Sequence, residues 1–400
     1  MARLPGVEAP ERVVCHVDMD CFYAACERLR EPELDGEPLV VGMGYEEGET
    51  HGAVATASYE AREYGVESAM AISEALELLP RRATADDPAD TGVYRPVDMA
   101  FYESVSEDVR AVLEADAETI RHVSIDESYL DLGEFAWADA ESFGRRLKAD
   151  VEAAAGVVAS VGIAPNMTTA KLASDAEKPD GLVVVRPDEV RAFLEPMDVA
   201  ELHGVGPVTA RELREMGLET AGDVAAADEA ALVERFGERG RDVHAQARGE
   251  DDRAVEPKGR PKSLSSESAF VEATVDPADK CDRVRALAAE VADRAADRGA
   301  LYRTIGIKVV EPPFDVSTRA RSLSGPVEDP TLLEAVAVDL LSEFEAVAVR
   351  KLGVRVSNLS FGDRDQASLD AWGSVDAPEE DRRPQRHGGV GGQTDLTEFD

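Results

Sequence analysis

The sequence predicts an α+β protein made of several domains. At 400 residues, 44% of them apolar, the chain is long enough for two or three separate hydrophobic cores. Strand-like and helix-like runs alternate up to residue 187, helical segments separated by glycines follow, and a second mixed pattern starts at residue 264. These observations predict an α/β domain, a helical domain and a second α/β domain, in that order.

The first domain, residues 13–187, is predicted to contain a β-sheet platform that follows an N-terminal extension at 1–12. A buried strand at 13–17 and a hairpin at 123–132 belong to the platform, and residues 33–79 are predicted to be a small subdomain inserted between them. Further strands are expected at 38–41, 52–56, 157–163 and 182–185, and helices at 23–30, 58–64, 138–155 and 168–177. Asn166 is placed to cap the last helix.

Acidic residues stand at two of these strand ends. Asp18 follows the strand at 13–17, and Asp126 and Glu127 lie near the bend of the hairpin. Carboxylate oxygens suit Mg²⁺, and two such ions about 3.5 to 4 Å apart clamp the attacking and leaving oxygens of a phosphoryl displacement. The pattern therefore predicts nucleotidyl transfer or its reverse. For any single aspartate, a solvated strand end in an acidic chain is the alternative.

Side chains near the first acidic cluster are suited to a nucleotide. An aromatic ring under the sugar leaves no room for a 2′-hydroxyl, so Tyr23, beside Phe22, could select deoxyribonucleotides. Tyr59 and Arg62 share a helical face, where the guanidinium could grip triphosphate oxygens and the hydroxyl could donate. Lys171 would add a point charge. For Arg62 and Lys171 a solvated helix surface is the alternative.

The helical domain, residues 188–250, contains a Gly-x-Gly turn at Gly204 and Gly206 that fits a helix-hairpin-helix. Backbone N–H groups at such a turn can bind a DNA phosphate without net positive charge. Residues 251–263 form a candidate linker, in which 253–262 holds four basic residues and one acidic residue. A basic strap beside nucleic acid explains this island, and a solubilising linker is the alternative.

The second α/β domain, residues 264–362, reads strand, helix, strand, strand, helix, strand. This βαββαβ order is the ferredoxin-like arrangement. Basic groups that alternate with apolar ones along its strands are predicted to lie on the sheet face away from the helices. The tail at 363–400 lacks periodicity and is predicted to be disordered. It ends with Gln393, Leu396 and Phe399, which can project together from one helical turn into a groove.

The charge of the chain is strongly negative. Its formal net charge is −39, and only eight of the 43 basic residues are lysines. Such a surface resembles those of salt-adapted cytoplasmic proteins. At about 1 M salt the Debye length is about 3 Å, so the acid excess does not exclude DNA as a partner.

The cysteines and the hydropathy pattern predict a cytoplasmic protein. The four cysteines show no metal-like or paired spacing, so they are predicted to be apolar fillers in a reducing compartment. No stretch reaches the roughly 18 uninterrupted apolar residues of a membrane span, and no signal-peptide core is found at the N-terminus. We therefore expect no membrane partner.

Several motifs in order resemble the Y family of DNA polymerases, the lesion-bypass enzymes of the DNA polymerase IV type. They are V-D-M-D-C-F-Y-A at 17–24, A-T-A-S-Y-E-A-R at 55–62, S-I-D-E-S-Y-L-D at 124–131, V-G-I-A-P-N at 161–166, A-K-L-A-S-D at 170–175, K-P-D-G at 178–181 and L-H-G-V-G-P at 202–207. The resemblance spans residues 13 to 361. With the acid excess, it points to a salt-adapted archaeon as the source.

The resemblance implies a ferredoxin-like palm with inserted fingers, a helix-hairpin-helix thumb, a basic linker and a βαββαβ little finger. It implies two Mg²⁺ ions, with Mn²⁺ as an alternative, held by Asp18, the Met19 carbonyl, Asp126 and Glu127, and Glu127 close to the primer 3′-hydroxyl. The incoming dNTP would contact Cys21, Phe22, Tyr23, Tyr59, Arg62 and Lys171, with Tyr23 as the sugar gate.

The resemblance also implies partners. Primer-template DNA would contact Gly204, Gly206, Lys258, Arg260, Lys262, Arg303, Arg319, Arg321 and Arg355. A sliding clamp would bind Gln393, Leu396 and Phe399, although Phe399 is followed by Asp400 where a second aromatic is common. Met167 and Asp98 depart from the family pattern, which puts nearby phosphate and template contacts in doubt. We expect a monomer.

The expected activity is template-directed addition of dNTPs to a primer, at low fidelity and without a proofreading exonuclease. The small inserted segment would press little on the nascent base pair, so damaged bases would be tolerated. Two alternatives remain at this point. One is a nucleotide cyclase on a similar palm, and the other is a non-catalytic DNA-binding adaptor recruited by a clamp.

Overall fold

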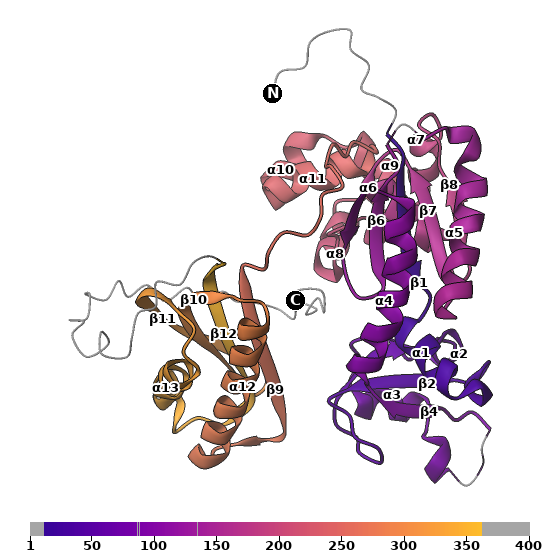
Figure 1. Cartoon of the computed structure of the whole chain (residues 1–400). Coiled ribbons are helices and arrows are strands. Elements are labelled where there is room, and N and C mark those ends of the chain that lie inside the picture. Colours follow the sequence, from indigo (N-terminus) through magenta and orange to yellow (C-terminus); the bar gives the residue numbers. More distant parts are fainter. Residues whose placement is uncertain (1–11, 86, 88, 134, 362–400) are drawn as a thin grey trace. The chain divides into compact units, whose positions relative to one another are not determined.

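The computed structural model describes residues 12–85, 87, 89–133 and 135–361 (Figure 1). The chain divides into two compact units, residues 1–258 and 259–400, and the division falls inside the predicted linker. The predicted N-terminal extension, apart from Arg12, lies outside the described residues. The tail with Gln393, Leu396 and Phe399 also lies outside them.

A five-stranded sheet forms the centre of the first unit, in the order β5-β6-β1-β7-β8. Its strands are β1 (Val14–Met19), β5 (Thr119–His122), β6 (Glu127–Asp131), β7 (Ala159–Ala164) and β8 (Leu182–Val184). The pairs β5–β6, β6–β1 and β1–β7 are antiparallel, and β7–β8 is parallel. The predicted hairpin is present, but its first strand is β5, which ends before residue 123.

Helices cover both faces of this sheet. The helices α4 (Met99–Asp116) and α5 (Ala140–Ala155) pack on the face that buries Cys15 and Val17. The helix α6 (Met167–Ala176) packs on the other face, against Val14. Because side chains alternate along a strand, His16 and Asp18 also point toward α6. Asn166 caps α6 as predicted, since its side chain accepts a hydrogen bond from the Thr169 N–H at 2.9 Å.

A smaller sheet, in the order β3-β2-β4, forms the inserted segment. It consists of β2 (Leu39–Met43), β3 (Ala53–Ala57) and β4 (Val93–Pro96), accompanied by α2 (Tyr59–Arg62) and α3 (Ile72–Leu78). Before it comes α1 (Phe22–Arg30), and single 3₁₀ turns occur at Pro32–Leu34, Arg82–Thr84 and Trp137–Asp139. Because β4 pairs in parallel with β2, the inserted sheet extends beyond the predicted limit at residue 79.

The last part of the first unit is helical. It comprises α7 (Val190–Leu194), a 3₁₀ turn at Val199–Glu201, α8 (Pro207–Glu215), α9 (Ala221–Ala226), α10 (Glu229–Phe236) and α11 (Glu238–Ala247). Gly204 has φ +79°, a conformation that favours glycine, and Gly206 is the N-cap of α8. The predicted helix-hairpin-helix differs in one respect. The element just before Gly204 is the 3₁₀ turn at Val199–Glu201 and not a full helix.

The second unit has the predicted βαββαβ order. Its elements are β9 (Ser263–Thr274), α12 (Pro277–Asp297), β10 (Leu301–Glu311), β11 (Asp315–Val327), α13 (Pro330–Leu341), a 3₁₀ turn at Ser342–Phe344 and β12 (Val349–Ser360). The sheet is antiparallel, in the order β11-β10-β12-β9. Each helix connects strands that flank a third strand, which is the split βαβ arrangement. Both helices contribute to one core on a single sheet face.

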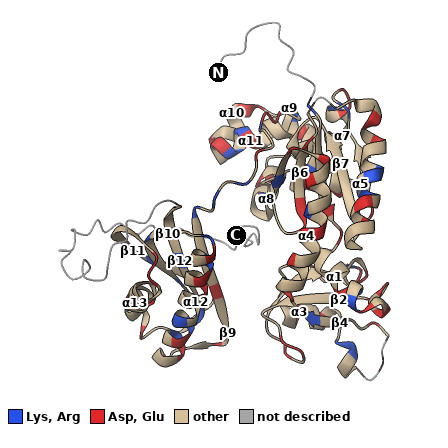
Figure 2. Cartoon of the chain, viewed as in Figure 1, with Lys and Arg blue, Asp and Glu red and all other residues tan. Residues whose placement is uncertain are grey.

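Acidic residues are spread over the helices of both units, with basic residues among them (Figure 2). Cys15, Cys21, Cys26 and Cys281 are all unpaired. Two of the cysteines, Cys15 and Cys26, are buried, whereas Cys21 and Cys281 are partly exposed. Among the described residues, no helix is long and apolar enough to cross a membrane.

Candidate active site

The pairing of β1 with β6 brings two of the predicted carboxylates together. Asp18 lies directly opposite Glu127 in the antiparallel register. The Lys171 Nζ, on α6, lies 2.8 Å from Asp18 Oδ2 and 3.2 Å from Glu127 Oε1. The Lys178 Nζ lies 2.7 Å from Asp18 Oδ1 and 2.9 Å from Asp175. Two ammonium groups therefore neutralise this carboxylate pair.

Asp126 is the third predicted carboxylate and has different surroundings. Its Oδ1 accepts a hydrogen bond of 2.6 Å from Ser124, and its carbonyl accepts one of 3.0 Å from the Met19 N–H. No lysine, arginine or histidine forms an ion pair with it in the described part of the chain. Across the same residues, no three His, Cys, Asp or Glu side chains lie close enough to hold a metal ion by themselves.

The pKa values of the three acids shift in different directions, because lysines contact Asp18 and Glu127 and no basic side chain of the described residues pairs with Asp126. Burial raises the pKa of Asp126, and the negative charges of Asp18 and Glu127 raise it further. Burial alone would also raise the pKa of Asp18, but Lys171 and Lys178 outweigh it and lower the pKa. In the same way, His16 and Lys171 overcome burial and lower the pKa of Glu127 to about 2. Asp126 is thus a carboxylate whose ionised form needs a cation.

Asp20, two residues after Asp18, is a structural carboxylate that sequence reasoning missed. It is buried and accepts hydrogen bonds from the Tyr59 hydroxyl at 3.1 Å, the Ser160 hydroxyl at 2.9 Å and the Asp180 N–H at 2.7 Å. These bonds tie the inserted segment to the central sheet. They also place Tyr59 beside the carboxylate cluster, although its hydroxyl points to Asp20.

The N-terminus of α1 is open at the same place. Its N-cap, Cys21, has φ 47° and ψ 47°, and no side chain caps the helix. Backbone N–H groups in the first turn of a helix bind anions readily. Arg62 donates to the Ala57 carbonyl at 3.0 Å, and its guanidinium lies 4.9 Å from the centroid of the Tyr59 ring. The predicted nucleotide residues Cys21, Phe22, Tyr59 and Arg62 therefore come from adjacent segments.

Tyr23 is supported from below by a second aromatic ring. It stacks on Tyr102, with ring centroids 4.6 Å apart and an interplanar angle of 18°. Tyr102 is fully buried and donates its hydroxyl to Glu27 Oε1 at 2.6 Å. The hydrogen bond holds Tyr102 in place, and the stacking on Tyr102 fixes the plane of the Tyr23 ring. The two departures from the family pattern also have structural roles, since Met167 is buried in a core and Asp98 caps α4.

The start of the linker is fastened to α6. The Asp251 side chain is 3% exposed and accepts hydrogen bonds from the Thr168 N–H at 3.0 Å and hydroxyl at 2.8 Å. Asn166 Nδ2 donates to the Gly249 carbonyl at 3.0 Å, and Arg253 donates to Thr168 at 3.1 Å. Residues 249–253 are therefore part of the first unit, and the sequence prediction of a linker from 251 begins too early.

We expect the Asp251 anchor to make stability depend on pH. Burial would raise the pKa of Asp251, but hydrogen bonds from Arg253 and Thr168 lower it to about 2, against 3.8 ordinarily. A lowered carboxyl pKa stabilises the fold above the unfolded pKa, and this contribution is lost as pH falls from about 4 to 2. Asp251→Asn should lower the free energy of unfolding by about 2 kcal/mol at pH 7. Denaturant unfolding at pH 7, 4 and 3 should show this difference shrinking with acid; a constant difference would contradict the assignment.

The Gly-x-Gly turn presents its backbone outward. A Cβ atom built on Gly204 or Gly206 would meet no heavy atom within 4 Å. These glycines are therefore not required by packing inside the unit. Open space at both positions is what the close approach of a DNA phosphate needs.

The predicted positions of Arg319 and Arg321 are wrong. They pair in register with Ile307 and Ile305, which are buried under the helices, so all four side chains share one sheet face. Residues two apart in a strand face the same way, and the prediction ignored this. Arg319 binds Glu343 at 2.7 Å and Arg321 binds Asp339 at 2.5 Å, both on the helix side. Arg303 lies at a β-bulge and donates to the Leu323 carbonyl at 3.2 Å.

The open face of the second sheet carries a different set of basic residues. Arg355 lies on it as predicted, opposite Gly306 and Ser265. Lys308 and Lys351 share this face, where their ammonium groups lie 3.0 and 2.5 Å from Glu267 carboxylate oxygens. Sequence analysis missed both lysines. Lys351 is four residues from Arg355 on the same strand, so the alternation of side chains already placed the two on one face.

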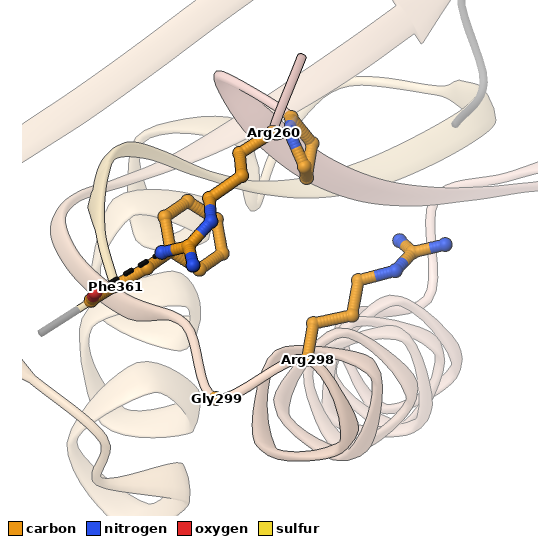
Figure 3. A pocket seen from close by; sticks show the side chains of 5 residues that line it. Arg260, Arg298, Gly299 and Phe361 are labelled. Carbon is orange, nitrogen blue, oxygen red and sulfur yellow. Dashed lines mark hydrogen bonds between the residues drawn. The ribbon is translucent and has the colours of Figure 1, made fainter. Parts of the chain in front are cut away.

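The predicted linker residue Arg260 lies at an open cavity of about 390 Å³ in the second unit. Figure 3 shows its guanidinium over the Phe361 ring, with Arg298 on another side of the cavity. Arg260 donates to the Phe361 carbonyl at 3.0 Å. Lys258 and Lys262 lie in the same stretch and are exposed.

Family models match most of the chain. The impB/mucB/samB family model matches residues 17–175, its C-terminal domain model matches residues 261–370, and the IMS family HHH motif matches residues 187–218. The first of these contains every predicted catalytic residue, and the last contains the Gly-x-Gly turn. The chain belongs to this family, the Y-family DNA polymerases.

Relatives and solved structures agree. The DNA polymerase IV of Halobacterium salinarum is 63% identical to the chain, covering 92% of this chain and 90% of that protein. A solved Y-family DNA polymerase chimera is 29% identical, with a TM-score of 0.77 over 88% of this chain and 100% of that one. An insertion ternary complex of Dbh DNA polymerase is 27% identical, with a TM-score of 0.62 and the same coverage.

These findings confirm the predicted class. The chain is a DNA-directed DNA polymerase of the translesion type. The cyclase and the non-catalytic adaptor are not favoured. The salt-adapted character expected from the acid excess fits the similarity to a Halobacterium protein.

Proposed function

We propose that Asp18, Asp126 and Glu127, with the Met19 carbonyl, hold two Mg²⁺ ions for addition of a dNTP to a primer 3′-hydroxyl. The observation that carries this proposal is the position of Lys171 against Asp18 and Glu127, 2.8 and 3.2 Å away. The ammonium group of Lys171 thus occupies a space between two carboxylates that favours positive charge. When bound, the two ions activate the attacking oxygen and stabilise the leaving one.

The residues fit hard divalent cations. All the side-chain donors are carboxylate oxygens, which Mg²⁺ and Mn²⁺ prefer. Burial raises the pKa of Asp126, and the negative charges of Asp18 and Glu127 raise it further, while no basic side chain of the described residues forms an ion pair with Asp126. A cation at this place would remove the repulsion between Asp126 and its two neighbours.

The lysines then have a second task. Lys171 and Lys178 contact Asp18 from α6 and from the segment that follows it. Once Asp18 binds divalent cations, both ammonium groups are available for triphosphate oxygens. Arg62 and the first turn of α1 would bind the same phosphates, the first by its guanidinium fork and the second by N–H groups.

Metal-dependent primer extension tests this function. The full chain, with a primer-template, dNTPs and Mg²⁺ in high-KCl buffer, should extend the primer and should stop when EDTA is added. A control without template should give no product. DNA binding without extension under all metal and salt conditions would reject the proposal in favour of the adaptor.

Tyr23 should control sugar selection. Its ring, held by stacking on Tyr102, would lie where a 2′-hydroxyl must go. Tyr23→Ala should therefore lower the preference for dNTP over rNTP by about tenfold or more in kcat/KM, since the steric exclusion is removed. Tyr23→Phe is the matched control and should keep the preference. If Tyr23→Ala selects sugars like the parent, Tyr23 is not the gate.

The open face of the second sheet is proposed to bind DNA. Arg355→Ala should weaken primer-template binding and reduce the salt dependence of the affinity by about one ion, because one phosphate contact is lost. Arg321→Ala is the control, since Arg321 pairs with Asp339 on the helix side. Fluorescence anisotropy across KCl concentrations measures both. Equal effects of the two substitutions would contradict this choice of face.

Other parts of the predicted function remain proposals. The Gly204–Gly206 turn and the basic stretch with Lys258, Arg260 and Lys262 would bind the DNA backbone. The C-terminal motif would bind a sliding clamp, and the protein would act as a cytoplasmic monomer with low fidelity. Pull-down of a clamp with and without residues 393–400 tests the motif.

A further inference from the structure

A buried histidine lies beneath the candidate catalytic carboxylate. His16 is in the middle of β1, its side chain has no exposed surface, and its ring lies 4.4 Å from that of Tyr129. Its Nε2 is 2.7 Å from Glu127 Oε1, and its Nδ1 is 2.8 Å from Ser174 Oγ. Ser174 Oγ is also 2.7 Å from the Lys171 carbonyl. One chain of polar contacts thus joins Glu127, β1 and α6.

The proton positions follow from counting donors. The Ser174 hydroxyl has one proton, which goes either to the Lys171 carbonyl or to His16 Nδ1. In the second case the neutral ring carries its proton on Nε2, and in the first case an imidazolium carries protons on both nitrogens. The group facing Nε2 is a carboxylate oxygen of Glu127 at 2.7 Å, and a carboxylate oxygen accepts hydrogen bonds. His16 Nε2 therefore donates to Glu127 in either arrangement.

We propose that His16 is a positioning residue that holds Glu127 by Oε1, so that Oε2 remains available to a divalent cation. This inference rests on the proposed function of Glu127. Ser174 fixes the orientation of the ring, and through it the carboxylate is kept in register with the helix that carries Lys171. Removal of the residue that hydrogen-bonds a metal-binding side chain typically lowers metal affinity or activity by about 10- to 100-fold.

A satisfied core histidine without influence on the site is the alternative. Two neutral amides distinguish the two roles because they match different ring nitrogens. His16→Gln places its amide nitrogen near the position of Nε2 and can still donate to Glu127. His16→Asn reaches only the position of Nδ1 and can contact Ser174 alone. A purely structural role would make both variants similar.

The test measures Mn²⁺ binding to the full chain, without DNA or nucleotide, by electron paramagnetic resonance of the free ion. His16→Asn should weaken binding by about tenfold or more, and His16→Gln should restore most of it. In primer extension, His16→Asn should lower kcat with little change in the KM for dNTP. In a Glu127→Gln background, His16→Asn should have no further effect on Mn²⁺ binding.

Three outcomes would overturn the proposal. These are parental Mn²⁺ binding by His16→Asn, equal losses in the Asn and Gln variants while both keep a cooperative thermal transition, and a further loss in the Glu127→Gln background. A parent chain that binds Mn²⁺ but never extends a primer would refute the proposed polymerase function instead. The effect of His16 on Mn²⁺ binding would still be measurable in that case.

Discussion

Asp126→Asn should abolish primer extension, with kcat/KM at least about 10³-fold lower, because a neutral amide replaces a proposed metal-binding carboxylate that forms no ion pair with a basic side chain of the described residues. The same substitution should leave the fold intact. Burial and two neighbouring negative charges raise the pKa of Asp126, so its ionised form opposes folding at neutral pH. We therefore expect the thermal midpoint to stay the same or to rise. Primer extension and a thermal melt on one sample measure both effects.

Asp131→Asn is the matched control for this prediction. Asp131 lies at the other end of β6, where it binds Arg12 at 3.2 Å. The substitution makes the same chemical change at the far end of the strand that Asp126 precedes, so activity should remain within a few-fold of the parent. Primer-template affinity should be unchanged in both variants. Substantial extension by Asp126→Asn would remove this residue from the metal-binding set.

Gly162→Ala should destabilise the first unit and also inactivate the enzyme. A Cβ atom at Gly162 would lie 2.1 Å from the Ala170 carbonyl oxygen and 2.4 Å from the Ser174 N–H nitrogen. Both are backbone atoms of α6, so the helix itself must move away from β7. We expect the free energy of unfolding to fall by about 3 kcal/mol. Because α6 carries Lys171, the displacement should also lower activity, and denaturant unfolding and primer extension measure the two losses.

Gly144→Ala provides the control. Its added Cβ would also meet an atom at 2.4 Å, but this atom is the end of the Leu182 side chain, which can rotate. Gly144 lies inside α5, where alanine is favoured over glycine by about 1 kcal/mol. We expect a change below about 1 kcal/mol and normal extension. Native stability in Gly162→Ala would show that α6 does not pack as closely as described.

The strands and acidic motifs could be predicted because they are local patterns. A run of apolar residues ending in Asp18 predicts β1, and Asn166 before a helical run predicts the cap of α6; both are confirmed. The helix α4 was not predicted, although Tyr102, Val105, Val109 and Leu113 recur at helical spacing and are buried. The exposed acidic residues between them, such as Glu103 and Glu107, complete an amphipathic pattern, so the signal for this helix was present in the sequence and was missed.

The electrostatics of the site could not be predicted, because the partners are far apart in the chain. Lys171 and Asp18 are separated by 153 residues, and His16 and Glu127 by 111. Nothing in the local sequence specifies that α6 packs beside β1 with its lysine over the carboxylates. The open face of the second sheet was misread for another reason. Arg319 and Arg321 are four and two residues from the buried Leu323 on the same strand, so strand parity alone places them on the helix side, and the prediction did not apply it.

The anchor at Asp251 affects how this polymerase can be recombined with its relatives. Residues 249–253 are bonded to the first turn of α6, whereas the second unit begins at Gly259. A hybrid that exchanges C-terminal segments should therefore place its junction after Arg253 and before Gly259. A cut upstream of Gly249 would replace the partners of Asn166 and Thr168 and would disturb the first turn of α6, the helix that carries Lys171, even if both halves were otherwise native.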